Sequence, residues 1–320
     1  MRMRAPTLFL TLLLAACTPH QQVVGEREAA PRLDADAVIA GDGARLPLHA
    51  WLPQGEPRGV LLGIHGFNDY GNAFAIPAAR WTEQGYAVYA YDQRGFGTAP
   101  TPGTWPGVAA LVDDLNEVTG VVAARHAGKS LTLVGVSMGG AVVMTALADS
   151  RVKAAQGAVL VGPAVWGRAS MTWATQAALW LVAHTLPTLR LTGRGLDITP
   201  SDNVEMLRTL GADPLVIKRT RVDALWGVVN LMDSAFAAAP AITRPLLVLY
   251  GAHDEIIPEA PTRDMLCRLN GHHRVAVYPE GYHMLLRDLQ AGVVHDDITA
   301  WVAAPDASLP SGAHADDWEC

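Results

Sequence analysis

A serine lies between glycines at residues 135–140, where the sequence reads GVSMGG. The apolar run LTLV precedes this segment and the helix-like AVVMTALAD follows it, so Ser137 is predicted at a turn from a strand into a helix. Gly135 and Gly139 complete the pattern G-x-S-x-G, in which small neighbours let the backbone come close and a strained turn lifts the serine hydroxyl clear of the sheet. The segment predicts Ser137 as a nucleophile, and a tight glycine turn with an incidental serine is the alternative.

A serine hydroxyl is a weak nucleophile until a base takes its proton, and the base needs an acid to orient it. His283 lies in YPEGYHMLLRD and Asp254 lies in VLYGAHDEIIP, each just after a predicted strand. Among the histidines, His283 is chosen because it stands between the last predicted strand and the closing helix. Asp254 is chosen over the adjacent Glu255, whose side chain would face elsewhere.

Acyl transfer also needs backbone N–H donors aimed at the developing oxyanion, and the loss of one donor costs roughly 100 to 1,000-fold in rate. The N–H of Met138, directly after the serine, is one candidate. The second is expected in HGFNDYG, which follows the predicted strand GVLLGIHG. There His65 and Gly66 let the backbone turn, so the N–H of Phe67 is the candidate donor, while His65 itself is expected to be structural.

Six short apolar runs predict buried strands, and helical segments separate several of them. They are residues 59–66, 86–92, 131–137, 157–163, 245–251 and 274–280. Continuous apolar strands alternating with helices predict an α/β fold whose mostly parallel sheet is covered on both faces. Two further short runs about a Gly-Asp-Gly turn, in DAVIAGDGARLPLHAWLP, predict an antiparallel hairpin. We place the core at residues 36–163 and 244–303.

The long interval at residues 164–243 predicts an inserted helical cap, because it exceeds one crossover helix. It contains ASMTWATQAALWLVAHTL, which has no Asp, Glu, Lys or Arg. Trp166, Trp173 and Trp180 recur every seven residues, which puts the latter two on one helical face. These tryptophans could pack the insertion onto the core, or form an apolar lid over a lipid-like substrate or against a membrane, and the two interpretations could hold for different residues.

The chain begins with MRMRAPTLFLTLLLAAC, whose apolar stretch is shorter than the roughly 20 residues of a membrane span. Residues 1–16 are therefore predicted to be a secretory signal peptide. The ending LAAC resembles the bacterial lipobox, which implies a lipidated Cys17 and a lipoprotein anchored to a membrane of the bacterial cell envelope. An ordinary signal with an incidental Cys17 is the alternative. Residues 17–35 are expected to be a tether, and residues 304–320 a loose tail.

The composition, 50% hydrophobic and 17% charged over 320 residues, predicts a folded chain with a large core. The formal net charge of −7 becomes −9 when Arg2 and Arg4 leave with residues 1–16, so no nucleic-acid partner is expected. Cys267 and Cys320 lie far apart and predict no disulfide framework. No metal site or cofactor is expected, because GHH at 271–273 lacks further ligands at metal spacing and no glycine-rich phosphate loop is present.

Five segments together resemble the monoacylglycerol lipase and lysophospholipase branch of the α/β-hydrolases, often grouped under the serine aminopeptidase S33 name. They are HGFNDYGNAF, GYAVYAYDQRGFG, GVSMGG, GAHDEIIP and GYHMLLRD, in the order expected of that family over roughly residues 36–303. The resemblance implies an α/β-hydrolase fold with a cap and a triad of Ser137, Asp254 and His283. One departure is RGFGTAPTPGTW, where the family more often has RGHG followed by serine and glycine.

The expected function is that of a serine hydrolase cleaving carboxylic esters through an acyl-enzyme, with a small-molecule or single-chain lipid ester as substrate. The cap and the resemblance favour a monoacylglycerol or a lysophospholipid. The same residues could instead act on a small soluble ester, a thioester or an N-terminal peptide bond, the last needing an acidic patch from cap residues such as Asp197, Asp202, Glu205 or Asp233. A non-catalytic envelope protein is a further alternative, against which the intact triad argues. The oligomeric state stays open.

Overall fold

The structure is a computed structural model that describes residues 18–193, 195–315 and 318. The expected signal peptide at 1–16 and the expected lipidation site Cys17 lie outside the described residues. Among the residues that are described, no helix combines the length and the apolar character that a membrane crossing needs.

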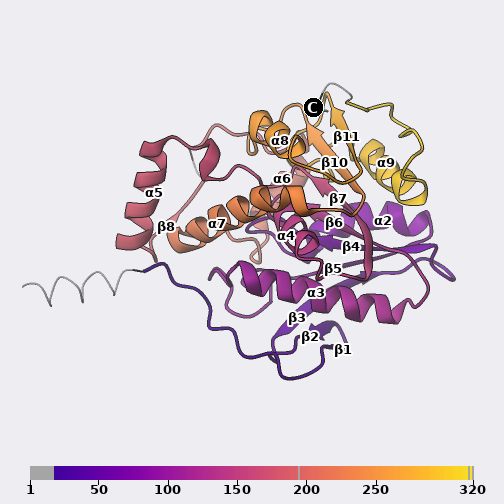
Figure 1. The fold of residues 1–320 in the computed structure, drawn as a ribbon, viewed down its shortest axis with the longest axis horizontal. Helices are drawn as coiled ribbons and strands as arrows, with labels where there is room; N and C mark the ends of the chain where they lie inside the picture. The colour runs from indigo at the N-terminus through magenta and orange to yellow at the C-terminus, as the bar shows by residue number, and fades with distance from the viewer. Residues whose placement is uncertain (1–17, 194, 316–317, 319–320) are drawn as a thin grey trace, which may run out of the picture.

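A nine-stranded sheet runs through the middle of the described chain, in the order β1-β2-β3-β5-β4-β6-β7-β10-β11 (Figure 1). Six of these strands are parallel: β4 (Gly59–Ile64), β5 (Tyr86–Tyr91), β6 (Leu131–Val136), β7 (Ala155–Val161), β10 (Leu246–Gly251) and β11 (His273–Tyr278). At one edge β1 (Arg32–Asp34), β2 (Ala37–Ile39) and β3 (Arg45–Trp51) pair antiparallel. The predicted α/β fold and hairpin are confirmed, and each predicted apolar run overlaps one parallel strand.

Helices cover both faces of the sheet, which explains why its strands are apolar without alternation. Leu62 of β4 packs in a cluster with residues of α3 (Val108–Arg125), α4 (Met138–Ala148) and α8 (Glu259–Leu266). Its neighbour Leu61 packs in the cluster on the other face, with α2 (Ala75–Glu83) and α9 (Ala291–Ala303). Both leucines are fully buried, so each face of the sheet has a core of its own.

The insertion between β7 and β10 forms the cap. It contains η2 (Arg168–Ser170), α5 (Trp173–Thr185), β8 (Arg190–Leu191), α6 (Val204–Ala212), β9 (Thr220–Arg221), α7 (Val222–Ala238) and η3 (Ala239–Ala241). The last long helix, α7, packs on α4 and joins the core, whereas α5 lies farther out (Figure 1). Trp173 is 82% exposed and Trp180 51% exposed, so the first interpretation of the cap tryptophans, packing onto the core, does not describe these two.

Residues 18–35 were expected to be a tether, but from Gln22 onwards they are bound to the core. Gln22 donates its backbone N–H to the carbonyl of Trp105 at 2.9 Å. Arg27 pairs with Asp114 and Glu117 of α3, each at 2.7 Å. Carboxylates on α3 thus hold this polar segment through Arg27, and the segment ends in the edge strand β1.

The expectation of a loose tail at 304–320 is also wrong for the described part. His314 forms a β-bridge with Ala276 of β11, and Leu309 is 3% exposed. Trp318 packs against Tyr250 with ring centroids 4.9 Å apart. The tail thus covers β11, which would otherwise be an open sheet edge. No disulfide framework was expected from the cysteine positions, but Cys267 is disulfide-bonded.

Candidate active site

The turn after β6 holds Ser137 in a strained conformation, with φ +52° and ψ −116°. A non-glycine residue at positive φ costs on the order of 1–3 kcal/mol, and the surroundings must hold it there. The Ser137 N–H donates to the carbonyl of Val161 at 2.9 Å, and the Ser137 carbonyl accepts from Ala164 at 3.0 Å. A Cβ at Gly139 would collide with the carbonyl of Ile64, so the close approach of α4 to β4 requires glycine.

His283 and Asp254 meet beside this turn. Their Nδ1 and Oδ2 atoms are 2.7 Å apart, and the two side chains are 7% and 1% exposed. The other carboxylate oxygen of Asp254 accepts from the N–H groups of Ile256 and Ile257 at 2.8 and 2.9 Å. Because a carboxylate only accepts, Nδ1 carries the hydrogen and Nε2 is left as a base. Glu255 points away and accepts from the N–H of Thr199 in the cap at 2.6 Å.

Gly162, which the sequence analysis did not single out, leaves room for this pair. It follows β7 with φ +49°, a conformation that favours glycine. A Cβ there would lie 3.2 Å from Oδ2 of Asp254 and 3.4 Å from Nδ1 of His283. The sequence does contain a signal for Gly162, because it is the last residue of the apolar run GAVLVG. Functional residues of parallel α/β sheets gather where the strands end, so a glycine at the end of a predicted strand could have been singled out.

Ser137 and His283 open onto one cavity of about 210 Å³. Gly66 and Phe67, from the loop where the second oxyanion donor was expected, line the same cavity. A Cβ on Gly66 would lie 3.4 Å from Cβ of Ser137, so this backbone passes close to the serine. Met138 is the first residue of α4, with its side chain buried. The remaining lining is mostly apolar, and includes Val136, Ile256, Met284 and Leu286.

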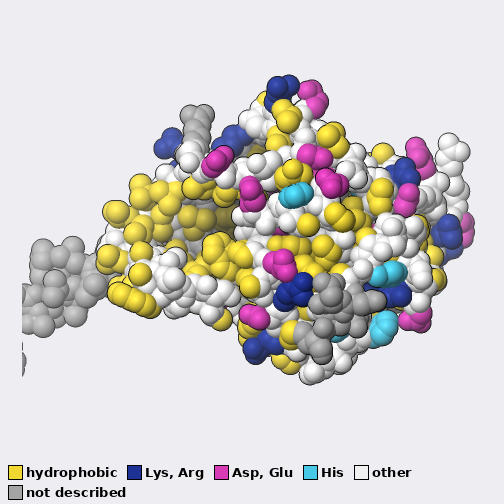
Figure 2. Space-filling view, turned by 90° about the horizontal axis from the view of Figure 1, so that it is seen from above, with side chains coloured by type: hydrophobic (Ala, Val, Ile, Leu, Met, Phe, Trp, Pro, Cys, Tyr) yellow, Lys and Arg dark blue, Asp and Glu magenta, His cyan; other side chains and the backbone are white. Residues whose placement is uncertain are grey.

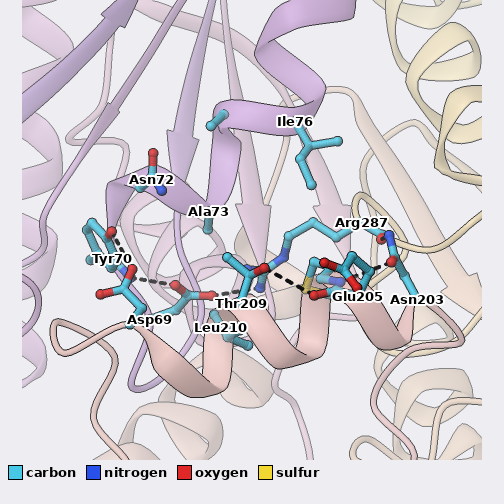
Figure 3. A pocket seen from close by; sticks show the side chains of 13 residues that line it. Asp69, Tyr70, Asn72, Ala73, Ile76, Asn203, Glu205, Thr209, Leu210 and Arg287 are labelled. Carbon is cyan, nitrogen blue, oxygen red and sulfur yellow. Dashed lines mark hydrogen bonds and ion pairs between the residues drawn. The ribbon is translucent and has the colours of Figure 1, made fainter.

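A second cavity, of about 370 Å³, shares Asp69, Ala73 and Arg287 with the first. Figure 3 shows side chains of α6 facing the segment from Tyr70 to Ile76 across it. Asp69 and Arg287 form an ion pair at 2.6 Å, with 9% and 12% of their side chains exposed. Neither residue of this pair was predicted from the sequence.

The loop at 66–70 is held from the cap side. Asn68, at φ +66°, donates its Nδ2 to Oγ1 of Thr220 at 2.7 Å and accepts at its carbonyl from the N–H of Ile217 at 2.9 Å. Tyr70 donates its hydroxyl to Asp213 at 2.7 Å. Burial and this carboxylate raise the pKa of Tyr70 to about 12. The loop therefore depends on contacts with residues far away in the sequence.

The base of the same loop is fixed by Asp92, directly after β5. Its Oδ1 accepts from the N–H of Gly71 at 2.9 Å, and its Oδ2 accepts from the N–H of Thr98 at 2.9 Å. Its Oδ1 also lies 3.0 Å from Nε2 of His49. Burial alone would raise the pKa of Asp92, but these three contacts outweigh it and hold the pKa below its ordinary value.

His65 and Arg94 have structural contacts. Nε2 of His65 accepts from the N–H of Gln93 at 3.0 Å, so Nδ1 carries the hydrogen and donates to the carbonyl of Gly66 at 2.8 Å. Burial lowers the pKa of His65, which keeps the ring neutral. Arg94 pairs with Asp42 and Asp114, each at 2.8 Å, and lines neither of the two cavities.

The acidic residues proposed for an amine site are dispersed. Of the four named cap residues, Glu205 lines the second cavity. Asp233 pairs with Arg168, and Asp202 accepts from the N–H of Leu289 at 2.8 Å. Within the described ranges, no group of three His, Cys, Asp or Glu side chains could hold a metal ion.

Comparison with known proteins identifies the family to which the chain belongs. Residues 55–290 match the family model described as "Serine aminopeptidase, S33". The chain belongs to the serine aminopeptidase S33 family. A monoacylglycerol lipase of Mycolicibacterium smegmatis is 28% identical over 266 residues, which cover 82% of this S33 chain and 94% of that relative.

Solved structures share the S33 chain's fold. The monoacylglycerol lipase of Paleococcus ferrophilus superposes with a TM-score of 0.68 at 24% identity, covering 81% of this chain and 98% of that one. A soluble variant of monoglyceride lipase from Saccharomyces cerevisiae, in complex with a substrate analog, gives 0.71 at 20% identity, covering 89% and 97%. At these low sequence identities, both similarities show that the fold is shared and nothing more.

Proposed function

We propose that this S33 protein is a serine hydrolase that cleaves carboxylic esters, and that monoacylglycerol is its substrate. The observation that carries the proposal is the buried His283–Asp254 contact beside Ser137, with serine and histidine opening onto one cavity. A buried carboxylate that orients an imidazole next to a serine on a strained turn is the arrangement of a nucleophile with its base.

In the proposed reaction, Oγ of Ser137 attacks the ester carbonyl while Nε2 of His283 takes the hydroxyl proton. Asp254 stabilises the imidazolium that forms. The backbone N–H groups of Met138 and Phe67 donate to the oxyanion, and collapse of the intermediate passes the proton from His283 to the leaving alcohol. Water activated by His283 then hydrolyses the acyl-enzyme and frees Ser137.

Two observations support a lipid ester as the substrate. The cavity beside Ser137 is mostly apolar, which suits an acyl chain. The relatives named above are monoacylglycerol or monoglyceride lipases. We therefore propose that the acyl chain of a monoacylglycerol occupies apolar surface at this cavity.

The second cavity favours a neutral alcohol over an anionic headgroup. Its lining includes the carboxylates of Asp69, Glu205 and Asp213 but the single cation Arg287, which Asp69 already pairs. A phosphate there would meet an excess of negative charge. We propose that this cavity receives the glycerol portion of the ester, which ranks monoacylglycerol above lysophospholipids.

The test is hydrolysis by purified residues 18–320, which keep the N-terminal segment bound to the core. The panel contains p-nitrophenyl esters of two to sixteen carbons, monoacylglycerol, lysophosphatidylcholine and an aminoacyl anilide. We expect monoacylglycerol turnover that Ser137→Ala abolishes and that Ser234→Ala, on α7 and lining neither cavity, leaves unchanged. Turnover of the anilide alone would favour aminopeptidase activity, and the absence of any Ser137-dependent turnover would refute the proposed function.

We also propose that the protein is exported and anchored in the bacterial cell envelope through a lipidated Cys17. The support is the sequence LAAC after a short apolar stretch. Growth with an alkyne-bearing fatty acid should label the wild-type protein and leave Cys17→Ser unlabelled. Equal labelling of the two would refute the anchor.

A further inference from the structure

The cap presents an apolar face to solvent. We define the cap face by exposed residues of α5 and the segment after it: Trp173, Trp180, Leu181, Leu186, Leu189 and Leu191, each between 43% and 82% exposed. Helix α5 carries no Asp, Glu, Lys or Arg and buries only Ala183. Figure 2 shows hydrophobic side chains gathered at the cap end of the molecule, around a hollow. A contiguous surface of this kind marks an interaction site.

The described chain begins next to this face. Gln22 binds Thr104 through its Nε2, at 2.6 Å, and Trp105 through its N–H. The preceding residue, Gly103, lies against the cap, since a Cβ on it would be 3.8 Å from Nη1 of Arg190 in β8. Figure 1 shows the start of the described chain beside α5 and β8.

The link between Cys17 and this attachment is short. Five residue steps separate Cys17 from Gln22, and a fully extended chain spans at most about 3.5 Å per residue. The lipid-bearing residue would therefore lie within about 17 Å of Gln22. Beyond Gln22, the ion pairs of Arg27 with Asp114 and Glu117 fasten the segment to α3, so the attachment does not slide.

We propose that residues 22–34, here called the N-terminal strap, hold the lipidated Cys17 beside the cap face so that acyl chains and cap face enter one bilayer. The strap thereby fixes which side of the enzyme lies on the membrane, and the cap rests where a lipid substrate resides. This inference rests on the proposed lipidation of Cys17, but not on the identity of the ester. The bilayer is the proposed occupant because only five residue steps separate the expected anchor at Cys17 from Gln22, which is bound beside the cap face.

The first test lengthens the segment between Cys17 and Gln22 and leaves the cap face and the N-terminal strap unchanged. Twenty Gly and Ser residues are inserted between Pro19 and His20 of the full-length lipoprotein, which is reconstituted in vesicles of phosphatidylethanolamine and phosphatidylglycerol containing monoolein. Five residue steps become 25, and effective concentration falls roughly as the −3/2 power of linker length, so monoolein hydrolysis should fall about tenfold. Hydrolysis of p-nitrophenyl acetate should not change. An unchanged monoolein rate would overturn the proposal.

The second test reads contact of the face with lipid and needs no activity. Leu181→Cys, on the cap face, and Leu52→Cys, after β3, replace leucines that are 55% and 52% exposed, and each is labelled with an environment-sensitive fluorophore. On vesicles the label at 181 should brighten and shift to the blue, the label at 52 should not, and the spacer should weaken the change at 181. Equal responses at the two positions would overturn the proposal.

The outcomes separate the proposals from one another. A lipid-dependent signal at residue 181 in a protein without Ser137-dependent hydrolysis would refute the proposed reaction and support the strap. Hydrolysis of monoolein with no lipid-dependent signal at residue 181 would support the proposed reaction and refute the proposed role of the strap. A soluble dimer that Leu181→Glu dissociates and Leu52→Glu does not would assign the cap face to a second copy of the chain, and would overturn the membrane contact.

Discussion

Gly162→Ala tests whether the Asp254–His283 contact limits the reaction. The new methyl group would lie 3.2 Å from Oδ2 of Asp254 and 3.4 Å from Nδ1 of His283. Contacts this short force the neighbours to move by a few tenths of an ångström. A displacement of 1 Å in a catalytic group can cost about 100-fold, so we expect kcat to fall roughly tenfold. KM should stay the same, because Gly162 does not line the cavity at Ser137.

The substitution also places a Cβ at φ +49°, which should lower the free energy of unfolding by about 1–2 kcal/mol. Gly128→Ala is the matched control. Gly128 has φ +81°, and a Cβ built on it would have no atom within 4 Å. Alanine at 128 therefore has an unfavourable backbone conformation at positive φ, as alanine at 162 has, but it touches no neighbouring side chain. Both variants should lose similar stability in urea unfolding, while only Gly162→Ala should lose kcat on a p-nitrophenyl ester.

A kcat of Gly162→Ala within twofold of that of Gly128→Ala, with Asp254→Asn inactive, would refute this prediction. The acid would then matter, but its distance from His283 would tolerate the added methyl group. A rise in KM with kcat unchanged would equally contradict the prediction, since it would place the effect on substrate binding.

Three further predictions concern stability. Arg287→Met leaves the nearly buried Asp69 without its ion-pair partner and should lower the free energy of unfolding by about 3 kcal/mol. Adding Asp69→Asn to this variant should recover part of the lost stability in urea titrations. No recovery would mean that loss of the ion pair is not the cause. Asp92 has a folded pKa below its ordinary value of about 3.9, so its contribution is present above that pH and is lost as the pH falls through the lower folded pKa. The stability difference between wild type and Asp92→Asn should therefore be largest near pH 6 and shrink below pH 4, and a constant difference would contradict this. Ending the chain after Ala303 should lower the Tm and promote aggregation, because it uncovers β11, whereas a monomer of unchanged Tm would show that the tail does not protect the edge.

The sheet and the strand-end residues could be predicted because each leaves a local signal. Leu61 and Leu62 face opposite cores, so β4 had to be apolar without alternation, and the other central strands follow the same rule. Parallel strands end at a common edge, which brings the loops after β6, β10 and β11 together. This rule, together with the G-x-S-x-G pattern around Ser137, was enough to place Ser137, Asp254 and His283 near one another.

The contacts that support those residues leave no such signal. Asp69 and Arg287 are 218 positions apart, and no spacing pattern links them. Arg27 looked like one charge in a polar tether, because the carboxylates that hold it lie 87 positions away and beyond. The period of Trp173 and Trp180 predicted a shared helical face, but whether that face meets the core or solvent depends on how α5 docks. Ion pairs and docking are set by the tertiary fold.

The cap connects these distant contacts to the candidate site, because three of the loops that form the site are bonded to it. The loop at 66–70 is bonded through Asn68 to Thr220, and the loop after β10 through Glu255 to Thr199. The loop that carries His283 is bonded through the N–H of Met284 to the carbonyl of Pro200, at 3.0 Å. A displacement of the cap on a bilayer would therefore act on all three loops at once. If the proposed membrane contact forms, it would act on the loops that carry Asp254 and His283 as well as on the supply of substrate, and the cap face is the surface where such coupling would begin.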